Sequence, residues 1–256
     1  MLLAVDLGNT ETTIGVFDGD ELIRTWRIAT QSNRTGDELM LLINSFLRMG
    51  GLGRDVEISG FAVSSVVPRA TLAMREMVPH YFDFEPVIVE PGIRTGMPIR
   101  IDNPKEVGAD RICNAVGAYE EHGGPVVAID LGTGTTFDAV SVDGEYLGGA
   151  IAPGLAIAAN ALVSQTAQLR LVEFVRPERL IGKGTAEAIQ SGIVIGYSCL
   201  IDGMLELFAK ELGGDTRTVM TGGLAEVMAP NLQRVDVVDP WLVLKGLRII
   251  YGRNVE

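Results

Sequence analysis

Two short, similar loops contain the side chains of this sequence that are best suited to phosphate chemistry. One covers residues 6–13 (Asp-Leu-Gly-Asn-Thr-Glu-Thr-Thr) and the other residues 130–136 (Asp-Leu-Gly-Thr-Gly-Thr-Thr). The glycine at the third position lets the backbone turn tightly and approach an anion, and the hydroxyls and amides that follow can donate hydrogen bonds to phosphate. The leading Asp can hold a cation. Two such loops facing each other would bind a nucleoside triphosphate.

A pair of opposite charges, Asp110 and Arg111, lies between these loops in the sequence. Asn103 followed by Pro104 predicts the start of a helix, with Asn103 as its cap and the charged pair projecting from the same helix. An adjacent Asp-Arg pair is often no more than a solvated helix face. Alternatively, Asp110 accepts the proton of a substrate hydroxyl, and Arg111 binds a carboxylate or phosphate through its planar guanidinium.

Hydrophobic patterning and turn residues predict the elements that position these groups. Partial alternation of apolar and polar residues predicts strands in the first half of the chain, over residues 2–6, 12–18 and 21–28. Thr35 and Glu38 form a capping box that opens a helix ending at Gly50, and Pro68 opens a helix between strands at 58–66 and 86–90. The pattern then restarts, with strands over 125–130, 134–142 and 145–151 and a long helical stretch over 185–212.

This repeated succession of strands and helices predicts an α/β protein whose mixed sheets are covered by helices. A length of 256 residues suits one large or two ordinary domains, and the internal repeat favours two similar lobes. We expect the lobes to span residues 1–122 and 123–256. Because no low-complexity linker divides them, we expect them to pack closely, with the ligand cleft between them.

Composition limits the possible partners and the compartment. The net charge of -12 argues against general binding to nucleic acid or to an anionic membrane, because both need basic patches. The N-terminus shows no basic region followed by a long apolar region, and no stretch of about 18 charge-free apolar residues appears later, so we expect a cytoplasmic protein. Cys113 and Cys199 lie in apolar, helix-like contexts and are expected to be buried thiols. The two Cys and two His are too scattered for a zinc site.

Four motifs in series resemble one enzyme family. They are Asp6-Leu7-Gly8-Asn9-Thr10, Gly108-Ala109-Asp110-Arg111, Asp130-Leu131-Gly132-Thr133-Gly134-Thr135-Thr136-Phe137-Asp138 and Gly148-Gly149-Ala150-Ile151-Ala152-Pro153-Gly154. A single loop of the Asp-Leu-Gly-Thr type recurs across actin-like and Hsp70-like ATPases and sugar kinases. In this order and spacing, however, the four motifs look like type III pantothenate kinase, and the resemblance covers nearly the whole chain.

The resemblance implies a duplicated actin-like (ribonuclease H-like) α/β fold and a defined reaction. ATP and pantothenate would be the substrates and 4′-phosphopantothenate the product, in the first step of coenzyme A synthesis. Members of this family are similar in being homodimers that need a monovalent cation, potassium or ammonium, in addition to magnesium. These properties come from the resemblance, since apolar helix faces in the sequence only permit a dimer.

Site roles are implied only where the motifs match. Asp110 would be the proton acceptor, Asp130 would bind the monovalent cation, and Asp6 would hold magnesium. The residues implied to contact ATP are Asp6, Leu7, Gly8, Asn9, Thr10, Glu11, Thr12, Thr13 and Thr133. Those implied to contact pantothenate are Ile101, Gly108, Ala109, Asp110, Arg111 and Thr185.

Two positions depart from the family pattern, and two other function classes stay open. Ile101 stands where a Tyr is common, so that an apolar wall replaces a phenol contact, and Gly134 stands where Ala is usual. The chain could instead be another actin-like phosphotransferase, acting on a sugar, acetate or polyphosphate. It could also be a non-catalytic accessory factor for transcription, although no helix-turn-helix sequence or basic face supports direct DNA binding.

Overall fold

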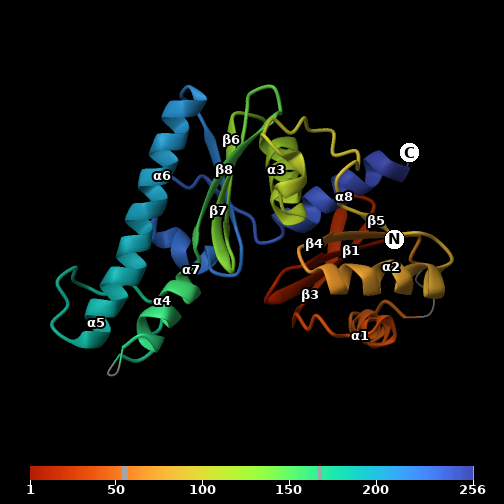
Figure 1. The fold of residues 1–256 in the computed structure, drawn as a ribbon, viewed down its shortest axis with the longest axis horizontal. Coiled ribbons are helices and arrows are strands. Elements are labelled where there is room, and N and C mark those ends of the chain that lie inside the picture. Colours follow the sequence, from red (N-terminus) through yellow and green to blue (C-terminus); the bar gives the residue numbers. More distant parts are fainter. Residues whose placement is uncertain (54–56, 167–168, 256) are drawn as a thin grey trace. The chain divides into compact units, whose positions relative to one another are not determined.

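The computed structural model describes residues 1–53, 57–166 and 169–255, and contacts divide the chain into two compact units (Figure 1). Unit 1 contains Met1–Pro98, Asp102–Gly117 and Leu242–Glu256, and unit 2 contains Ile99–Ile101 and Ala118–Trp241. The predicted lobes, residues 1–122 and 123–256, differ from this grouping at the C-terminal helix, which belongs to unit 1. Dividing the chain at a single position cannot predict that the C-terminal helix joins the first unit, because residues far apart in sequence can share one core.

Unit 1 is built on a five-stranded mixed sheet in the order β3-β2-β1-β4-β5. The strands β1 (Leu2–Leu7), β2 (Glu11–Asp18) and β3 (Glu21–Ala29) form an antiparallel meander, and β4 (Gly60–Ser65) and β5 (Val87–Ile88) continue the sheet in parallel. The first three strands agree with the sequence prediction to within two residues. The strand expected at 86–90 has only two residues.

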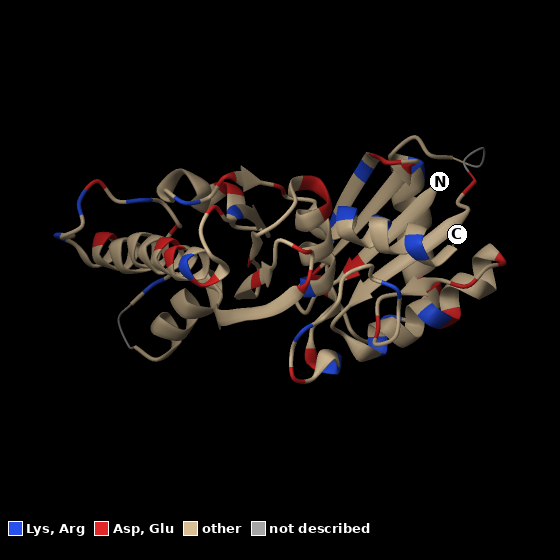
Figure 2. Cartoon of the chain, turned by 90° about the horizontal axis from the view of Figure 1, so that it is seen from above, with Lys and Arg blue, Asp and Glu red and all other residues tan. Residues whose placement is uncertain are grey.

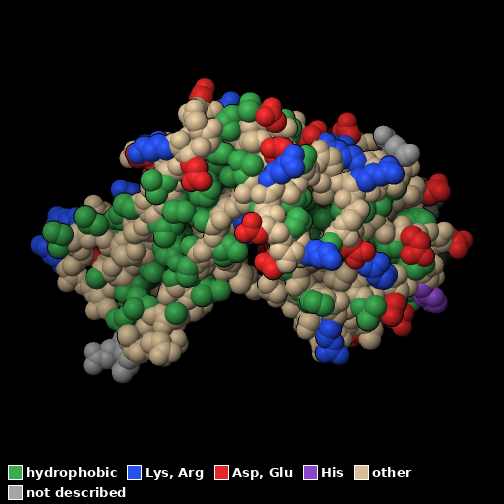
Figure 3. Space-filling model, turned by 45° about the horizontal axis from the view of Figure 1, so that its top comes forward, with side chains coloured by type: hydrophobic (Ala, Val, Ile, Leu, Met, Phe, Trp, Pro, Cys, Tyr) green, Lys and Arg blue, Asp and Glu red, His purple; other side chains and the backbone are tan. Residues whose placement is uncertain are grey.

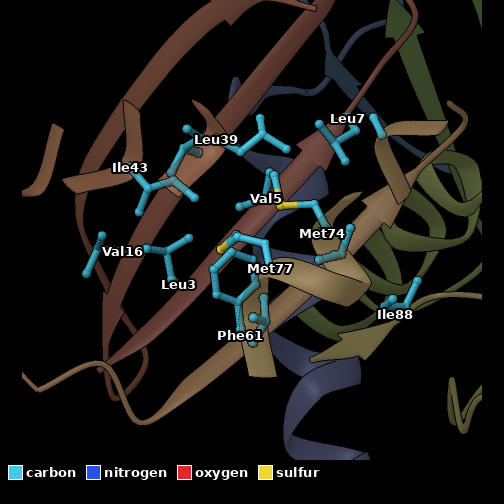
Figure 4. Packing of buried hydrophobic residues seen from close by; sticks show 14 of the residues in the cluster. Leu3, Val5, Leu7, Val16, Leu39, Ile43, Phe61, Met74, Met77 and Ile88 are labelled. Carbon is cyan, nitrogen blue, oxygen red and sulfur yellow. The ribbon is translucent and has the colours of Figure 1, made fainter. Parts of the chain in front are cut away.

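Helices cover both faces of this sheet, which explains why β1 is buried almost throughout. Leu3, Val5 and Leu7 point into a core with α1 (Gly36–Met49) and α2 (Pro68–Phe82), as Figure 4 shows. The helix α8 (Leu242–Val255) packs against β1, β2 and β4. The capping box predicted at the start of α1 is present, with the Thr35 hydroxyl accepting from Glu38 and the Glu38 carboxylate accepting from Thr35.

The predicted helix from Pro104 through Asp110 is wrong in one respect. Pro104–Glu106 forms a single 3-10 turn capped by Asn103, and the α-helix α3 (Ala109–His122) begins separately. Val107 between them is extended, with φ -75° and ψ 129°. Asp110 and Arg111 therefore lie in the first turn of α3, where backbone N–H groups have no helical partner, rather than in the middle of a longer helix.

Close contact of α3 with α8 sets where the side chains of α3 lie within unit 1. A Cβ built on Gly246 of α8 would lie 1.8 Å from the carbonyl oxygen of Cys113, so the two backbones touch at this point. Gly117 of α3 similarly approaches the carbonyl oxygen of Leu242. Only glycine permits such an approach, and the contact brings Cys113 to the α8 face of the sheet.

Unit 2 repeats the strand order of unit 1. Its sheet reads β10-β9-β6-β7-β8, with β6 (Val126–Leu131), β7 (Gly134–Val140) and β8 (Tyr146–Pro153) as the antiparallel meander. The strands β9 (Arg217–Thr221) and β10 (Val237–Val238) extend it in parallel. This confirms the predicted repeat, because strands one to five of each unit pair in the same way.

The helices of unit 2 are α4 (Leu155–Ser164), α5 (Thr185–Gln190), α6 (Gly196–Leu212) and α7 (Ala225–Met228). A π-helical segment, Ser191–Ile195, joins α5 to α6 and makes the long helical stretch predicted from the sequence. Gly213 ends it in the left-handed conformation, with φ 93°. Leu155, Val194 and Leu205 pack on the sheet in the core of this unit.

Much of that helical stretch lies outside the core. Among the described residues, Thr185–Leu212 is the one helical run long and apolar enough to cross a membrane, and 28% of its most apolar window is buried. Cys199 of α6 is exposed, whereas Cys113 is buried, so the predicted burial is right for one thiol and wrong for the other. Cys199 lies on the side of α6 away from the stripe of Ile201 and Leu205 that meets the sheet.

Acidic and basic residues are interspersed along the chain (Figure 2). The excess of acidic residues is thus distributed, with 33 Asp and Glu against 21 Lys and Arg. Such a surface favours small-molecule ligands held by a few specific groups over general electrostatic binding to a polyanion.

Candidate active site

The first predicted loop joins β1 to β2 in unit 1. Asp6 is partly exposed near the end of β1, and the Gly8 N–H donates to the carbonyl oxygen of Glu11 over 3.0 Å, which closes a tight turn. Asn9, Thr10 and Glu11 are exposed. The turn therefore presents backbone and polar side-chain groups to solvent directly after a carboxylate, as a phosphate loop requires.

Two residues of this loop are turned into the protein instead. Leu7 is 2% exposed and belongs to the core, so that only its backbone can face a ligand. Thr12 is also 2% exposed, and its hydroxyl shares a 2.8 Å hydrogen bond with the hydroxyl of Thr30. Thr13, by contrast, pairs with Asp6 across the β1–β2 ladder and projects on the same face of the sheet.

Asp6 is hydrogen-bonded to a residue that none of the four motifs contains. The hydroxyl of Ser64, at the carboxyl end of β4, donates to Oδ1 of Asp6 over 2.8 Å. Ser64 has no exposed surface, and it lies beside Asp6 in the parallel register of β1 and β4. No local sequence signal marks this serine, because the contact joins strands separated by 58 positions.

Asp130 occupies the corresponding place in unit 2, at the end of β6. The Gly132 N–H donates to the carbonyl oxygen of Gly134 over 3.0 Å, which closes a turn one residue shorter than that of unit 1. Thr133 is exposed at the tip of the turn. Thr221 lies beside Asp130 in the parallel register of β6 and β9, the position that Ser64 has beside Asp6.

Two glycines let the Asp130 carboxylate lie close against the backbone. A Cβ built on Gly222 would lie 2.4 Å from Oδ1 of Asp130, and one built on Gly132 would lie 3.3 Å from it. Gly222 also has a φ of +96°, which side chains disfavour. Carboxylate oxygens are ligands that hard cations prefer, and this cradle of Gly132 and Gly222 includes the Thr221-Gly222 turn, which the four motifs do not contain.

The described residues contain no cluster of three or more His, Cys, Asp or Glu that could hold a metal ion. A Mg²⁺ ion that arrives with a nucleotide needs only one or two carboxylates, because it keeps several waters and also binds the substrate phosphates. Asp6, at the head of an exposed loop, meets that requirement with a single carboxylate.

Asp110 is fixed at the start of α3. The backbone N–H of Arg111 donates to Oδ1 of Asp110 over 2.8 Å. A Cβ on Gly108 would lie 2.4 Å from the same oxygen, so the carboxylate lies over a position that only glycine leaves open. Ala109 is buried beside it. The motif residues Gly108 to Arg111 thus form one local structure around a carboxylate.

The surroundings of Asp110 change its acidity. Burial raises the pKa of the Asp110 carboxyl above its usual value, although the backbone N–H and the guanidinium of Arg111 act in the opposite direction. A carboxylate with a raised pKa is a stronger base than an exposed one. The solvated helix face is therefore the weaker interpretation of this pair.

Cys113 lies one turn after Asp110 on α3, close to the loop of unit 1 that begins with Asp6. Burial raises the pKa of its thiol well above the usual value, the negative charge of Asp6 raises it further, and a hydrogen bond with the Ser64 side chain lowers it. The negative charge of Asp110 also raises it. Asp6, Ser64, Cys113 and Asp110 are thus neighbours within unit 1.

The two remaining predicted contacts, Ile101 and Thr185, belong to unit 2. Ile101 lies over Gly148, where an added Cβ would come within 3.4 Å of its side chain. Thr185 is the exposed first residue of α5, after a turn in which the Lys183 N–H donates to Glu187. The side chain of Ile101 is thus an apolar surface beside Gly148.

Comparison with solved structures identifies the fold. A protein from Campylobacter jejuni described as a putative Baf family transcriptional activator matches with a TM-score of 0.62 and 20% identity, covering 98% of both chains. A ROK hexokinase from Thermus thermophilus matches with a TM-score of 0.55 and 14% identity, covering 100% of this chain and 99% of that one. These similarities confirm the predicted duplicated actin-like fold.

Sequence comparison identifies the family. A type III pantothenate kinase of Moorella thermoacetica is 48% identical over 254 residues, which cover 99% of this chain and 100% of that protein. The sequence model of the type III pantothenate kinase family matches residues 2–207. This confirms the resemblance carried by the four motifs, and the chain belongs to the type III pantothenate kinase family.

Proposed function

We propose that this protein transfers the γ-phosphoryl group of ATP to the primary hydroxyl of pantothenate and so forms 4′-phosphopantothenate, in the first step of coenzyme A synthesis. Family membership over the full chain supports this activity. The observation that carries the chemistry is the Asp110 carboxylate, held by the Arg111 N–H at 2.8 Å and made more basic by burial.

Phosphoryl transfer depends mainly on positioning and electrostatics, because the transition state requires little covalent chemistry from the protein. Asp110 accepts the proton of the attacking hydroxyl. The loop over residues 6–13 binds the ATP phosphates, through exposed Asn9, Thr10 and Glu11 and the backbone of its buried members, and Thr133 contributes from unit 2. Magnesium, held by Asp6, neutralises charge on the phosphates when it is bound.

Pantothenate contacts Gly108 and Ala109 beside the Asp110 carboxylate in unit 1. The family resemblance adds Ile101 and Thr185 of unit 2 as an apolar and a hydroxyl contact. Arg111 binds the pantothenate carboxylate through its guanidinium. A monovalent cation, potassium or ammonium, binds at Asp130, whose oxygen lies in the cradle of Gly132 and Gly222.

Purified protein assayed with ATP and a panel of acceptors tests the proposal. We expect phosphorylation of pantothenate at a kcat/KM far above that for sugars, acetate or polyphosphate. Equal turnover with a sugar, or hydrolysis of ATP without transfer, would place the chain among other actin-like phosphotransferases. An absence of transfer to every acceptor would favour the non-catalytic alternative.

The role of Arg111 can be tested through the two Michaelis constants. We expect Arg111→Lys to raise the KM for pantothenate by roughly tenfold and the KM for ATP by less than about twofold, because Lys keeps the charge and loses the planar fork. Steady-state kinetics with each substrate varied in turn measures the difference. Arg75→Lys is the matched control, since Arg75 forms an exposed pair with Glu90 at 2.7 Å in the same unit. Equal increases in both constants would place Arg111 at the phosphates.

We further propose a homodimer whose interface includes β8, α4 and α6. Residues 146–164 and 188–201 contain no charged side chain. Several large apolar residues of these elements are exposed, among them Ile151, Ile157 and Leu200. Figure 3 shows hydrophobic side chains gathered over the unit that contains α4 and α6. A second copy of the chain that covers this surface would bury apolar area that otherwise faces water.

Light scattering coupled to size-exclusion chromatography tests this proposal by measuring the mass of the protein in solution. The wild-type chain should elute with twice the mass of one chain, and Ile151→Glu should shift it to the monomer, because Ile151 is 68% exposed and the change leaves the core intact. Leu72→Glu, on α2 and 56% exposed, is the control and should remain dimeric. A monomeric wild type that binds phospholipid vesicles would instead favour a membrane for this surface.

We expect the protein in the cytoplasm, without a nucleic-acid partner.

A further inference from the structure

Ser64 has the geometry of a residue that sets the orientation of another side chain. Its hydroxyl donates to Oδ1 of Asp6 over 2.8 Å, and the serine has no exposed surface while Asp6 is partly exposed. The Asp6 carboxylate is thus held by a buried group through one of its two oxygens. A buried hydroxyl that serves only as packing would not need a carboxylate partner.

The direction of the hydrogen bonds follows from what each group can donate. An ionised carboxylate only accepts, so the single proton of the Ser64 hydroxyl is given to Asp6. Cys113, which is buried, lies close enough to Ser64 and Asp6 for both to act on its thiol.

Cys113 lies on the helix of one candidate catalytic segment of unit 1 and close to the other. It is three residues after Asp110 on α3, and its backbone is fixed by the contact with Gly246 of α8. Asp110 and Cys113 share one side of the helix at that spacing. The helix that carries the proposed base therefore passes close to Asp6 and Ser64.

Unit 2 contains a hydroxyl at the equivalent position. Thr221 lies beside Asp130 in the register of β6 and β9, as Ser64 lies beside Asp6 in the register of β1 and β4. Thr221 is 3% exposed, so the repeated module accommodates a threonine there. The repeat thus includes a hydroxyl on the neighbouring parallel strand in addition to the carboxylate and the glycine turn.

We propose that Ser64 is a positioning residue, which holds the Asp6 carboxylate in the orientation that binds magnesium and the nucleotide phosphates. The inference rests on the proposed function, because that function assigns Asp6 to magnesium and ATP. It predicts that the Ser64 hydroxyl is needed on the nucleotide side of the reaction and has little effect on the pantothenate side.

Ser64→Ala removes the hydroxyl and is the primary test. We expect a roughly 10- to 100-fold loss of affinity for magnesium-ADP in calorimetry, since loss of a group that orients a metal ligand has effects of this size. In the kinase assay, kcat/KM for ATP should fall by a similar factor while the KM for pantothenate changes less than about twofold. The magnesium concentration for half-maximal rate should rise. Ser64→Thr keeps the donor and should restore all three values.

Ser65→Ala is the matched control, because the neighbouring serine is hydrogen-bonded to Val67 and Thr71 and not to Asp6. It should leave nucleotide affinity at the wild-type value. Unchanged magnesium-ADP affinity in Ser64→Ala would overturn the proposal, and so would an equal loss in Ser65→Ala. If Ser64→Ala fails to fold, Ser64→Cys fills nearly the same space with a weaker donor and should weaken nucleotide binding several-fold, and wild-type binding by that variant would overturn the proposal.

The calorimetric measurement contains no pantothenate and therefore separates the two hypotheses. A wild-type chain that binds magnesium-ADP but does not phosphorylate pantothenate would refute the proposed substrate and leave the Ser64 result to be judged by itself. A wild-type chain that phosphorylates pantothenate, with Ser64→Ala indistinguishable from it in both assays, would refute the role of Ser64 alone.

Discussion

Asp110→Asn should lower kcat by at least about 10²-fold in a protein that is still folded, because the amide keeps the shape of the side chain and cannot accept the hydroxyl proton. The geometry supports a specific loss. The Asp110 oxygen is held by the Arg111 N–H at 2.8 Å over the glycine at position 108, and the Asn oxygen can accept the same hydrogen bond. Single-turnover kinetics with saturating ATP and pantothenate measures the chemical step.

The same substitution should affect stability in the opposite direction. Burial raises the folded-state pKa of Asp110, so the folded protein favours the protonated carboxyl, and the associated stability is lost as pH rises through that pKa. Where the wild-type carboxyl is ionised, its buried charge opposes folding, and Asn carries no such charge. We expect Asp110→Asn to unfold at an equal or higher denaturant concentration at pH 7, with the difference shrinking in acid.

The pH dependence of the wild type follows from the same shift. Since the base must be ionised, kcat should decline on the acid side with an apparent pKa above that of an ordinary Asp. Asp102→Asn is the control, because Asp102 is an exposed carboxylate eight residues earlier and in the same unit. Near-normal turnover in Asp110→Asn would remove Asp110 from the proton transfer, whatever its stability.

Removal of monovalent cations should have the second large effect. A carboxylate at the head of a phosphate loop repels the triphosphate unless cations offset the repulsion, and magnesium at Asp6 leaves Asp130 in need of its own counter-ion. We expect little activity in sodium or Tris buffer that contains magnesium, and recovery of at least about tenfold on adding potassium or ammonium, the scale of effects at metal sites.

Asp130→Ala tests whether this carboxylate is the cation ligand. The variant should lose most activity and should no longer respond to potassium or ammonium. Asp143→Ala is the control, since Asp143 is an exposed turn residue in the same unit and should retain the full response. Full wild-type activity without either ion, or an unchanged potassium response in Asp130→Ala, would assign the cation elsewhere.

Sequence patterns were reliable where structure depends on residues close together in the chain. The capping box of Thr35 and Glu38 formed as predicted, because both partners lie within one helical turn. The hairpin glycines Gly19 and Gly144 have φ values of 58° and 77°, as tight turns between neighbouring strands need. The turns of the loops at residues 6–13 and 130–136 were equally predictable, because each turn depends on a few consecutive residues.

Contacts between distant segments decided the rest. Ser64 beside Asp6 and Gly222 beside Asp130 come from the register of parallel strands, which no single stretch of sequence specifies. The break before α3 was missed because Pro104 opens a helix equally well whether it lasts one turn or five. The helix α8 returns to unit 1 and covers Cys113 because Gly246 lets it touch the backbone at Cys113, more than a hundred residues earlier. This contact depends on packing and not on local sequence pattern.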